Sequence, residues 1–334
     1  MTVLVTGATG FLGTSLVNRL LSEHERVRIL VRSPLKARRF TDRGVELVVG
    51  DIADRTVVST AVEGVRIIYH LAGRLLAPGV TATEYERTHL TGTAHVLACC
   101  EKASDLERLV HCSTTGVLGV TGERPAGEAA PIRPTNVYEA TKAAAEAAVR
   151  DATSRGVPAV IARPGLVYGP GDLHLLPFFR AVLGGRFRPI GRRPVSLHPI
   201  YIDDMSEALV RCGQHQAIAG ECFHFAGREP VSLAGLAAAI ARAGGTRLPQ
   251  GYIPLRAARA AATLGDRLPA KLKPIAPLTR SRLDFLTHSR VYDVTKAKRL
   301  LGFVAQTDLP IGAEQTMAWY REQGYLPEPA GDRR

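Results

Sequence analysis

A tyrosine and a lysine one helical turn apart are the residues of this sequence best suited to acid–base chemistry. They stand in Tyr138-Glu-Ala-Thr-Lys142, in a segment whose apolar residues recur at helical spacing, so both side chains leave the same face of a helix. Free tyrosine has a pKa of about 10 and is a poor base at neutral pH, but a neighbouring ammonium stabilises the phenolate and lowers that value. The pair therefore predicts proton transfer to or from a substrate.

Hydroxyl groups are expected beside this pair. The run Leu109 to His111 is typical of a buried strand, and Cys112, Ser113 and Thr114 follow it directly. Side chains at the carboxyl end of a parallel strand lie where open α/β sheets bind their ligands. A Tyr-x-x-x-Lys pattern is frequent by chance, and the hydroxyls predicted beside it strengthen its interpretation as a catalytic pair.

A glycine-rich segment, Thr6-Gly-Ala-Thr-Gly-Phe-Leu-Gly13, follows a predicted strand and precedes a predicted helix. Gly7 permits a tight turn, Gly10 lets the backbone approach a pyrophosphate, and Gly13 allows close packing of helix on strand. The helix N-terminus adds unpaired N–H groups and a positive dipole. Because the strand and the helix flank the glycines, the segment predicts a dinucleotide site.

The residue at the end of the second predicted strand bears on which dinucleotide is bound. NAD-binding sites of this kind carry a carboxylate there for the ribose 2′-hydroxyl, whereas this chain has Arg32 and no acid before Asp42. The basic residues Lys36, Arg38 and Arg39 follow. Since a guanidinium binds a 2′-phosphate and a carboxylate repels it, we expect NADP or NAD, with NADP favoured; the alternative is an exposed basic helix start.

The elements that position these residues alternate between strands and helices. Nearly continuous apolar runs predict buried parallel strands at Val3 to Val5, Val27 to Val31, Val45 to Val49, Val65 to Tyr69, Leu109 to His111 and Val157 to Ala162. Helical spacing predicts helices at Leu12 to Leu21, Thr56 to Val62, Thr91 to Ala103 and Tyr138 to Thr153. The alternation predicts an α/β fold with a Rossmann-type doubly wound parallel sheet.

Beyond Pro164 this pattern breaks, and proline and glycine punctuate the chain. Short helical segments follow at Leu176 to Leu183, Asp203 to Cys212, Ser232 to Ala243 and Leu255 to Leu268. We expect a smaller C-terminal substrate-binding lobe over the strand ends. The predicted organisation is a dinucleotide-binding domain over residues 1–164, a substrate lobe over residues 165–327 with some segments returning to the core, and a polar tail over residues 328–334.

Composition narrows the class of protein. The 334 residues carry 43 Lys and Arg against 31 Asp and Glu, a net charge of +12, with 46% hydrophobic and 22% charged residues, as in ordinary globular proteins. No apolar run reaches the roughly 18 residues that span a bilayer, and no signal peptide is visible. The basic residues are scattered without a nucleic-acid-binding motif. The five cysteines form no Cys-x-x-Cys pair, so we expect a cytoplasmic protein that binds neither a metal nor nucleic acid.

Several further motifs occur in a familiar order. They are Gly50-Asp-Ile52, His70-Leu-Ala-Gly73, Cys112-Ser-Thr-Thr-Gly-Val-Leu-Gly119, Arg163-Pro-Gly-Leu-Val-Tyr-Gly-Pro-Gly-Asp172, Ile200-Tyr-Ile-Asp-Asp204 and Lys296-Ala-x-x-x-Leu-Leu-Gly302. With the glycine loop and the Tyr–Lys pair, they cover residues 2 to about 325. The chain resembles an extended short-chain dehydrogenase/reductase of the NAD-dependent epimerase/dehydratase family.

This resemblance implies a role for each motif. Thr114 would polarise the reacting hydroxyl or carbonyl, Tyr138 would transfer the proton, and Lys142 would hold the nicotinamide ribose and tune the tyrosine. The cofactor would lie against Gly7, Thr9, Gly10, Phe11, Leu12, Gly13, Arg32, Asp51, Ile52, Leu71, Ala72, Gly73, Tyr138, Lys142, Pro164 and Val167. A homodimer through the helices at 91–103 and 138–153 is also implied.

Other polar residues have plainer interpretations. We expect His70, His89 and His111 to pack or bond locally. Glu139 and Glu146 are expected on a solvated helix face, and Asp203 and Asp204 are expected to cap a helix that begins near Met205.

Two departures from the family pattern bear on the substrate. Leu166 and His89 stand where nucleotide-sugar enzymes of the family carry asparagine, and a buried polar ligand needs such hydrogen-bond partners. The version Arg-Pro-x-x-Val-Tyr-Gly-Pro-Gly-Asp resembles instead the 3β-hydroxysteroid dehydrogenase and dihydroflavonol reductase branches, as does the stretch that begins at Pro277. The cluster Arg186, Arg188, Arg192 and Arg193 points the other way, since it could bind a diphosphate. Leu166, Arg188 and Arg192 are the candidate substrate residues.

Three functions remain open on the sequence. The first is an NAD(P)-dependent oxidoreductase that interconverts a secondary alcohol and a ketone on a small apolar ring substrate. The second is a nucleotide-sugar epimerase or dehydratase that retains NAD, and the third is a non-catalytic dinucleotide sensor. A membrane-skimming role for the Ala-rich segment Leu255 to Leu268 competes with simple packing on the substrate lobe, and no stable membrane insertion is expected.

Overall fold

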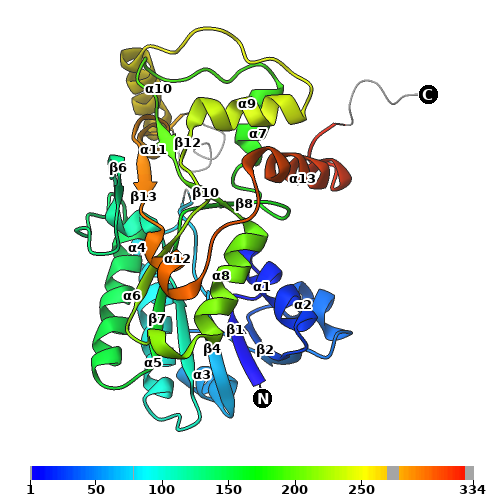
Figure 1. Ribbon diagram of the computed structural model, residues 1–334, viewed down its shortest axis with the longest axis vertical. Coiled ribbons are helices and arrows are strands. Elements are labelled where there is room, and N and C mark those ends of the chain that lie inside the picture. Colours follow the sequence, from blue (N-terminus) through cyan, green and yellow to red (C-terminus); the bar gives the residue numbers. More distant parts are fainter. Residues whose placement is uncertain (1, 78, 269–277, 328–334) are drawn as a thin grey trace.

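A seven-stranded parallel sheet forms the centre of the computed structural model, which describes residues 2–77, 79–268 and 278–327 (Figure 1). Its strand order is β11-β7-β5-β4-β1-β2-β3, and every pairing within it is parallel. The strands are β1 (Thr2–Thr6), β2 (Arg26–Val31), β3 (Glu46–Val49), β4 (Val65–His70), β5 (Arg108–Cys112), β7 (Ala159–Pro164) and β11 (Cys222–Phe225). Most of these strands are apolar and buried along their length, as strands covered on both faces must be.

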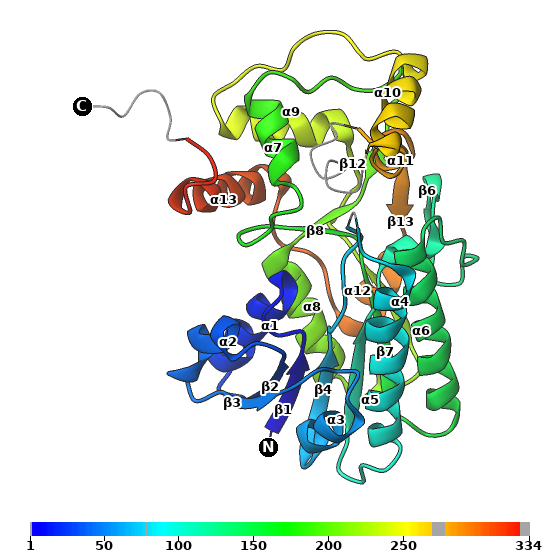
Figure 2. The same ribbon diagram turned by 180° about the vertical axis from the view of Figure 1, so that it is seen from behind.

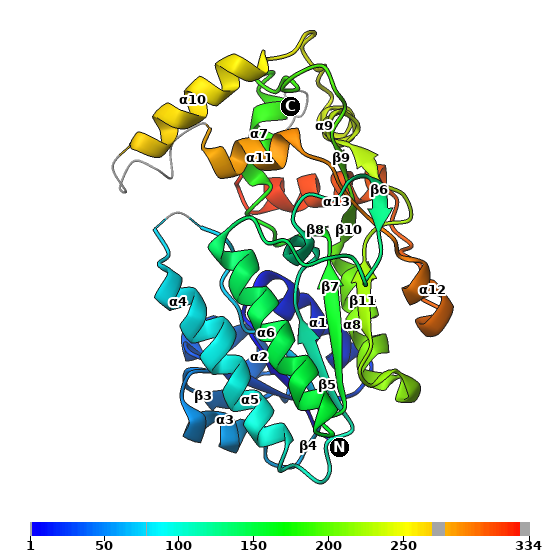
Figure 3. The ribbon, with the colours of Figure 1, turned by 90° about the vertical axis from the view of Figure 1, so that its left-hand side faces the viewer.

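Helices cover both faces of this sheet (Figure 3). One layer contains α1 (Phe11–Ser22), α2 (Pro34–Thr41) and α8 (Ile202–Gln214), and the other contains α3 (Arg55–Val62), α5 (Gly92–Cys100) and α6 (Val137–Ser154). Between β4 and α5 lie the short helix α4 (Ala82–Glu86) and a π-helical turn at Arg87–Thr91. A 3₁₀ turn, Thr115–Leu118, follows β5.

The order of the strands determines where a ligand can bind. The chain runs outward from β1 through β2 to β3, and then crosses to β4 and continues in the other direction. The crevice outside the carboxyl ends of β1 and β4 is therefore the topological switch point, where open α/β sheets bind their ligands. The glycine-rich segment follows β1, and the segment Leu71–Gly73 follows β4.

The second half of the chain builds a smaller lobe above the carboxyl ends of the strands (Figure 2). Its apolar core gathers α7 (Leu176–Leu183), α9 (Leu233–Ala243) and α13 (Leu309–Glu322), with α10 (Leu255–Arg267) and α11 (Arg280–Thr287) at its far end. Three two-stranded sheets join the lobe: β8 (Leu166–Tyr168) with β10 (Pro199–Tyr201), β9 (Ser196–Leu197) with β12 (Val231–Ser232), and β6 (Gly122–Ala126) with β13 (Arg290–Tyr292).

Some segments of the second half belong to the Rossmann layers. The strand β11 extends the sheet beside β7, α8 packs on α1 and on the sheet, and α12 (Thr295–Leu301) packs beside β11. The predicted helix at 203–212 is thus part of the nucleotide-binding core. These contacts join residues far apart in the sequence, and no local pattern reveals them.

The predicted fold class is confirmed. All six predicted strands and all four helices of the first half are present, with ends that differ by at most three residues. Helix α10 packs through Ala258 and Ala262 on Ile190 and Leu283, as the simpler of its two interpretations predicts. Among residues 2–77, 79–268 and 278–327, no helix is long and apolar enough to cross a membrane. The predicted tail over 328–334, and Pro277, lie outside the described residues.

Candidate active site

The glycine loop is shaped for a close backbone approach and an anion. Gly7 has φ of +73°, and a Cβ there would lie 2.7 Å from the carbonyl carbon of Leu71; a Cβ on Gly13 would overlap the Gly7 carbonyl oxygen. Gly10 is the N-cap of α1, and no described side chain caps it or places an acid in the first turn. The first N–H groups of α1 are thus available to an anionic group, so this loop fits a dinucleotide pyrophosphate.

The segment after β4 lies between this loop and the predicted catalytic lysine. The amides of Leu71 and Ala72 donate to the carbonyl and the hydroxyl oxygens of Thr6, at 3.2 and 3.1 Å. A Cβ on Gly73 would lie 3.3 Å from Nζ of Lys142. Three sequence-distant motifs therefore lie together at the switch point.

The structure distinguishes among the three hydroxyls that follow β5. Ser113 donates to Glu146 at 2.5 Å, and Thr115 donates to the carbonyl oxygen of Pro164 at 3.1 Å. Both hydroxyls therefore use their hydrogen within the buried interior of the protein. Thr114 accepts from the amide of Gly116 at 3.0 Å, and its side chain lies near that of Tyr138. Thr114 is consequently the hydroxyl that accompanies the tyrosine.

Tyr138 and Lys142 lie near the start of α6, whose N-cap Asn136 accepts the amide of Glu139 at 3.0 Å. Burial raises the pKa of Tyr138, and the nearby Thr114 hydroxyl opposes that rise only in part. Lys142 is buried and donates from Nζ to the carbonyl oxygen of Cys112 at 2.9 Å; burial lowers its pKa. The predicted lowering of the tyrosine pKa is therefore wrong for the protein alone, because desolvation of the phenolate outweighs its favourable interactions.

Two glutamates of α6 contradict the expectation of a solvated helix face. Glu146 is fully enclosed and pairs with Arg163 on β7, and Glu139 is buried and accepts from the amide and hydroxyl of Thr135. The helical repeat could have revealed Glu146, since the face that turns Tyr138 and Lys142 inward also carries the residue four positions later.

The three histidines bond or pack locally, as predicted. His70 lies between the hydroxyls of Thr6 and Thr93, and burial lowers its pKa to about 3. His111 is buried and has no side-chain hydrogen-bond partner among the described residues. His89 is buried and bonded within the protein. That its replacement of an asparagine disfavours a nucleotide sugar stays a prediction.

The remaining residues that are predicted to bind the cofactor lie around the same edge of the sheet. Asp51 follows β3, accepts the amide of Ala53 at 2.9 Å and pairs with Arg87 at 3.3 Å, while Ile52 is buried. Arg32 follows β2, is exposed, and makes no hydrogen bond or ion pair with the described residues. Pro164 ends β7, and Val167 lies in β8.

The candidate substrate residues do not come together. Leu166 is half-buried in β8 and packs on the core of the lobe. Arg188 donates to the carbonyl oxygen of Gln250 at 3.4 Å, and Arg192 donates to the hydroxyl of Tyr252 at 2.9 Å. Both arginines are exposed on the lobe, and no described contact joins them to Tyr138 or Lys142.

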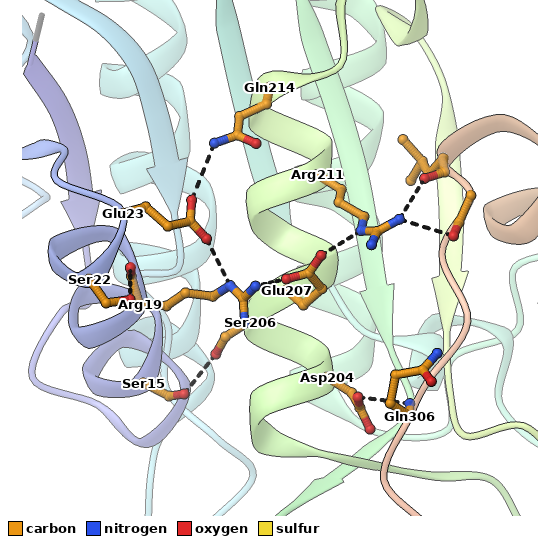
Figure 4. Close-up of polar contacts among 12 residues, drawn as sticks. Ser15, Arg19, Ser22, Glu23, Asp204, Ser206, Glu207, Arg211, Gln214 and Gln306 are labelled. Atoms are coloured by element: carbon orange, nitrogen blue, oxygen red, sulfur yellow. Dashed lines mark hydrogen bonds and ion pairs between the residues drawn. The ribbon is translucent and has the colours of Figure 1, made fainter.

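Asp203 and Asp204 tie the helix α8 to its neighbours rather than capping it, and Figure 4 shows the contact of Asp204 with Gln306. The helix begins at Ile202, so both residues lie inside its first turn. Asp204 accepts the amides of Gln306 and Thr307, each at 2.9 Å, and Asp203 accepts from the hydroxyl of Ser15 on α1. The predicted capping role is therefore wrong.

A groove of about 650 Å³ runs along the outer side of α1, between that helix, α8 and Trp319 of α13. Thr9, Gly10 and Phe11 form one end of it. Neither Tyr138 nor Lys142 lines it.

Comparisons with known proteins agree with this geometry. The model of the NAD dependent epimerase/dehydratase family matches residues 3–224. A Stigmatella aurantiaca protein named 4-hydroxy-2-methyl-3-oxo-4-farnesyl-3,4-dihydroquinoline-1-oxide ketoreductase is 30% identical, over 99% of this chain and 100% of its own. A Mycobacterium tuberculosis 3 beta-hydroxysteroid dehydrogenase/Delta 5→4-isomerase is 28% identical, over 90% of this chain and 85% of its own length.

The fold recurs in a solved structure of Bacillus cereus UDP-glucuronic acid 4-epimerase in complex with NAD. It matches with a TM-score of 0.77 and 21% identity, over 98% of this chain and 100% of that one. This likeness shows that the two proteins share a fold, and the family match spans the glycine loop and the Tyr–Lys pair. The chain is an enzyme of the NAD-dependent epimerase/dehydratase family, among the extended short-chain dehydrogenases/reductases.

Proposed function

We propose that the protein is an NADP-linked oxidoreductase that interconverts a secondary alcohol and a ketone on a small apolar ring substrate. The observation that carries this proposal is the arrangement of Thr114, Tyr138 and Lys142: the side chains of Thr114 and Tyr138 lie near each other, and Lys142, one helical turn after Tyr138, is buried and held by the carbonyl oxygen of Cys112. It supplies a proton donor and a second hydrogen bond for one reacting oxygen.

The glycine loop and the segment Leu71–Gly73 would hold the cofactor, with Arg32 at its adenosine end. When bound, a nicotinamide cofactor supplies or accepts a hydride at the carbon of the reacting group. The unpartnered guanidinium of Arg32 supports a 2′-phosphate there, because no described acid neutralises it.

In the reductive direction, the phenol of Tyr138 gives its proton to the carbonyl oxygen as the carbon becomes tetrahedral. The phenol is protonated at neutral pH, as even free tyrosine is, so a proton is available for the oxygen on which negative charge develops. Thr114 hydrogen-bonds the same oxygen, and Lys142, held by the carbonyl of Cys112, lies against the Gly73 backbone. In the oxidative direction the phenolate takes the alcohol proton back.

The surface around this site supports an apolar substrate. Apolar side chains are exposed on loops at the carboxyl end of β4 and β5, at the start of α6 and after β8: Leu75, Leu76, Val120, Ile132, Val137 and Leu173. Exposed apolar side chains on these loops favour a ligand with apolar surface. The two relatives described above act, by their names, on a quinoline ketone and on a steroid.

We also propose that the protein is a homodimer through α5 and α6. Their outward faces carry exposed alanines at positions 94, 140, 144 and 147, which allow close helix packing. Light scattering after size-exclusion chromatography measures the mass, and a monomer at micromolar concentration would contradict this part of the proposal.

The enzymatic proposal is tested by incubating the protein with NADPH and a panel of hydroxysteroid ketones, flavanonols, 2-alkyl-3-oxo acids and UDP-sugars. An oxidoreductase consumes one NADPH for each ketone reduced, whereas an epimerase converts a UDP-sugar with no net change in nicotinamide absorbance. Native mass spectrometry of freshly purified protein adds a second measurement. Tightly retained NAD together with UDP-sugar conversion would overturn the proposal.

A further inference from the structure

We propose that His89 is a positioning residue, which holds the backbone of the segment Leu71–Ala77 at a set distance from the catalytic helix α6. The inference rests on the roles proposed for Tyr138 and Lys142. Its first test requires no enzymatic activity, so the two proposals can fail separately.

The imidazole of His89 bridges two elements. It stands in the π-helical turn Arg87–Thr91 with 1% of its surface exposed. The amide of Arg74 donates to its Nε2 at 3.0 Å, and its Nδ1 lies 2.8 Å from the hydroxyl oxygen of Thr141 on α6. One buried side chain thereby ties the segment after β4 to the helix that carries Tyr138 and Lys142.

The contacts of Thr141 determine where the imidazole proton lies. The Thr141 hydroxyl is 3.0 Å from the carbonyl oxygens of both Val137 and Tyr138, so it donates its one hydrogen toward the helix backbone. Its oxygen is then the acceptor for His89, which must carry its proton on Nδ1. The lone pair of Nε2 faces the Arg74 amide, and both ring nitrogens are satisfied in the neutral form.

A second histidine holds the same segment from the other side. The amide of Ala72 donates to the hydroxyl oxygen of Thr6 at 3.1 Å, and that hydroxyl lies 2.8 Å from Nδ1 of His70. Nε2 of His70 lies 3.0 Å from the hydroxyl of Thr93. This arrangement assigns the opposite tautomer to His70, with its proton on Nε2.

Two amides of one short segment are therefore accepted by separate histidine–threonine pairs, with Gly73 between them. A Cβ on Gly73 would lie 3.3 Å from Nζ of Lys142 and 3.4 Å from Nε2 of His89. The His89 ring also meets the Tyr138 ring edge-on, with 5.6 Å between centroids. The same side chain thus sets the position of both the cofactor-binding backbone and the catalytic ring.

The first test is hydrogen–deuterium exchange at the amides of residues 72 and 74 in His89 variants. His89→Leu removes the acceptor of the Arg74 amide, so exchange at that amide is expected to rise by about tenfold or more. The longer side chain in His89→Gln can place an oxygen where Nε2 lies, so this variant is expected to restore protection of the Arg74 amide. The shorter side chain in His89→Asn extends only as far as Thr141, so this variant is not expected to restore it. The control is His111→Leu, which removes an equally buried imidazole without hydrogen-bond partners and should leave the segment protected.

The second test is ¹⁵N NMR of the wild-type imidazoles, with His89 assigned by the signal lost in His89→Gln. It is expected to show a protonated Nδ1 and an unprotonated Nε2 at neutral pH, and it remains decisive if His89→Leu does not fold. The opposite tautomer, or unchanged protection of residue 74 in a folded His89→Leu variant, would overturn the inference.

Once a substrate is known, a third measurement separates positioning from folding. His89→Leu is expected to lower kcat by about tenfold or more and to weaken NADPH binding, while His89→Gln recovers both. Equal kcat in the wild type and His89→Leu would also overturn the inference. Absence of ketone reduction in the wild type, with the exchange and NMR results as expected, would count against the proposed function alone.

Discussion

The carboxylate of Glu146 and the guanidinium of Arg163 form an ion pair in which both side chains are completely enclosed. Nη2 lies 2.7 Å from Oε2, and Nε lies 2.9 Å from Oε1, so the pair is bidentate. Burial alone would raise the pKa of Glu146, but the hydrogen bonds and charge of Arg163 hold it below its usual range. The pair fixes α6 on β7, one helical turn beyond Lys142.

Glu146→Ala is expected to lower the free energy of unfolding by about 3–5 kcal/mol, because it leaves the Arg163 charge buried and unpaired. Chemical denaturation measures the change. Glu101→Ala is the matched control, since the Glu101–Arg155 pair lies on the surface and should contribute at most about 1 kcal/mol. Similar losses in the two variants would show that burial does not distinguish the two pairs.

Tyr138→Phe is expected to reduce turnover by about 10²–10⁴-fold while cofactor affinity stays nearly the same. Phenylalanine keeps the ring contacts with Tyr85 and His89 but has no proton to exchange. Steady-state kinetics and an NADPH titration measure the two effects, with Tyr325→Phe, at an exposed tyrosine, as the control. Near-normal turnover in Tyr138→Phe would remove this residue from the mechanism.

Cofactor preference is expected to follow Arg32. The wild type should bind NADP more tightly than NAD, and Arg32→Asp should shift the preference toward NAD, because the carboxylate repels a 2′-phosphate and accepts from a 2′-hydroxyl. Arg26→Asp makes the same charge change at the opposite end of β2 and should leave the preference unaltered. Parallel titrations decide this, and a tenfold preference of the wild type for NAD would contradict it.

Leu166→Asn tests the polarity of the substrate. With an apolar ring substrate, the new amide lacks a partner and should cost roughly 1–3 kcal/mol in kcat/KM; Leu166→Met, which keeps an apolar side chain, should cost less. With a nucleotide sugar, the asparagine would gain a hydrogen bond instead. Improved turnover of a UDP-sugar by Leu166→Asn would therefore favour the epimerase.

Acid sensitivity is expected from three buried histidines. Burial lowers the pKa of His70 and His89 to about 3 and that of His111 well below its usual value. In the unfolded chain these residues titrate near 6.5, so below that pH the unfolded state binds the extra protons. Stability is therefore fully present above about pH 6.5 and falls as the pH drops toward the folded values.

The expected loss is about 2 kcal/mol for each of these histidines between pH 7.5 and pH 5. Urea denaturation at pH 7.5 and pH 5 measures it. His111→Leu removes one buried imidazole and should lessen the loss, whereas His174→Gln, at an exposed histidine, should not. An unfolding free energy that is the same at both pH values would refute the argument.

The sequence by itself determined the sheet, the dinucleotide loop and the Tyr–Lys pair. These depend on local periodicity: continuous apolar runs between helical segments, glycines at the end of the first strand, and a spacing of four residues on one helix. The family pattern added Thr114, but three adjacent hydroxyls are equivalent in local sequence. Only the partners of Ser113 and Thr115, at Glu146 and Pro164, show which of them is free for the site.

Tertiary structure decided the rest. Glu146 looks like a solvated glutamate until Arg163, on the following strand, is placed beside it, and the tautomers of His70 and His89 depend on threonines from three other elements. Helix α8 and strand β11 join the nucleotide-binding core although they follow the lobe segments in sequence. The helical repeat can place Glu146 on an inward face of its helix. The hydrogen-bond partners of buried polar groups, however, come from residues far away along the chain, and local patterns do not identify them.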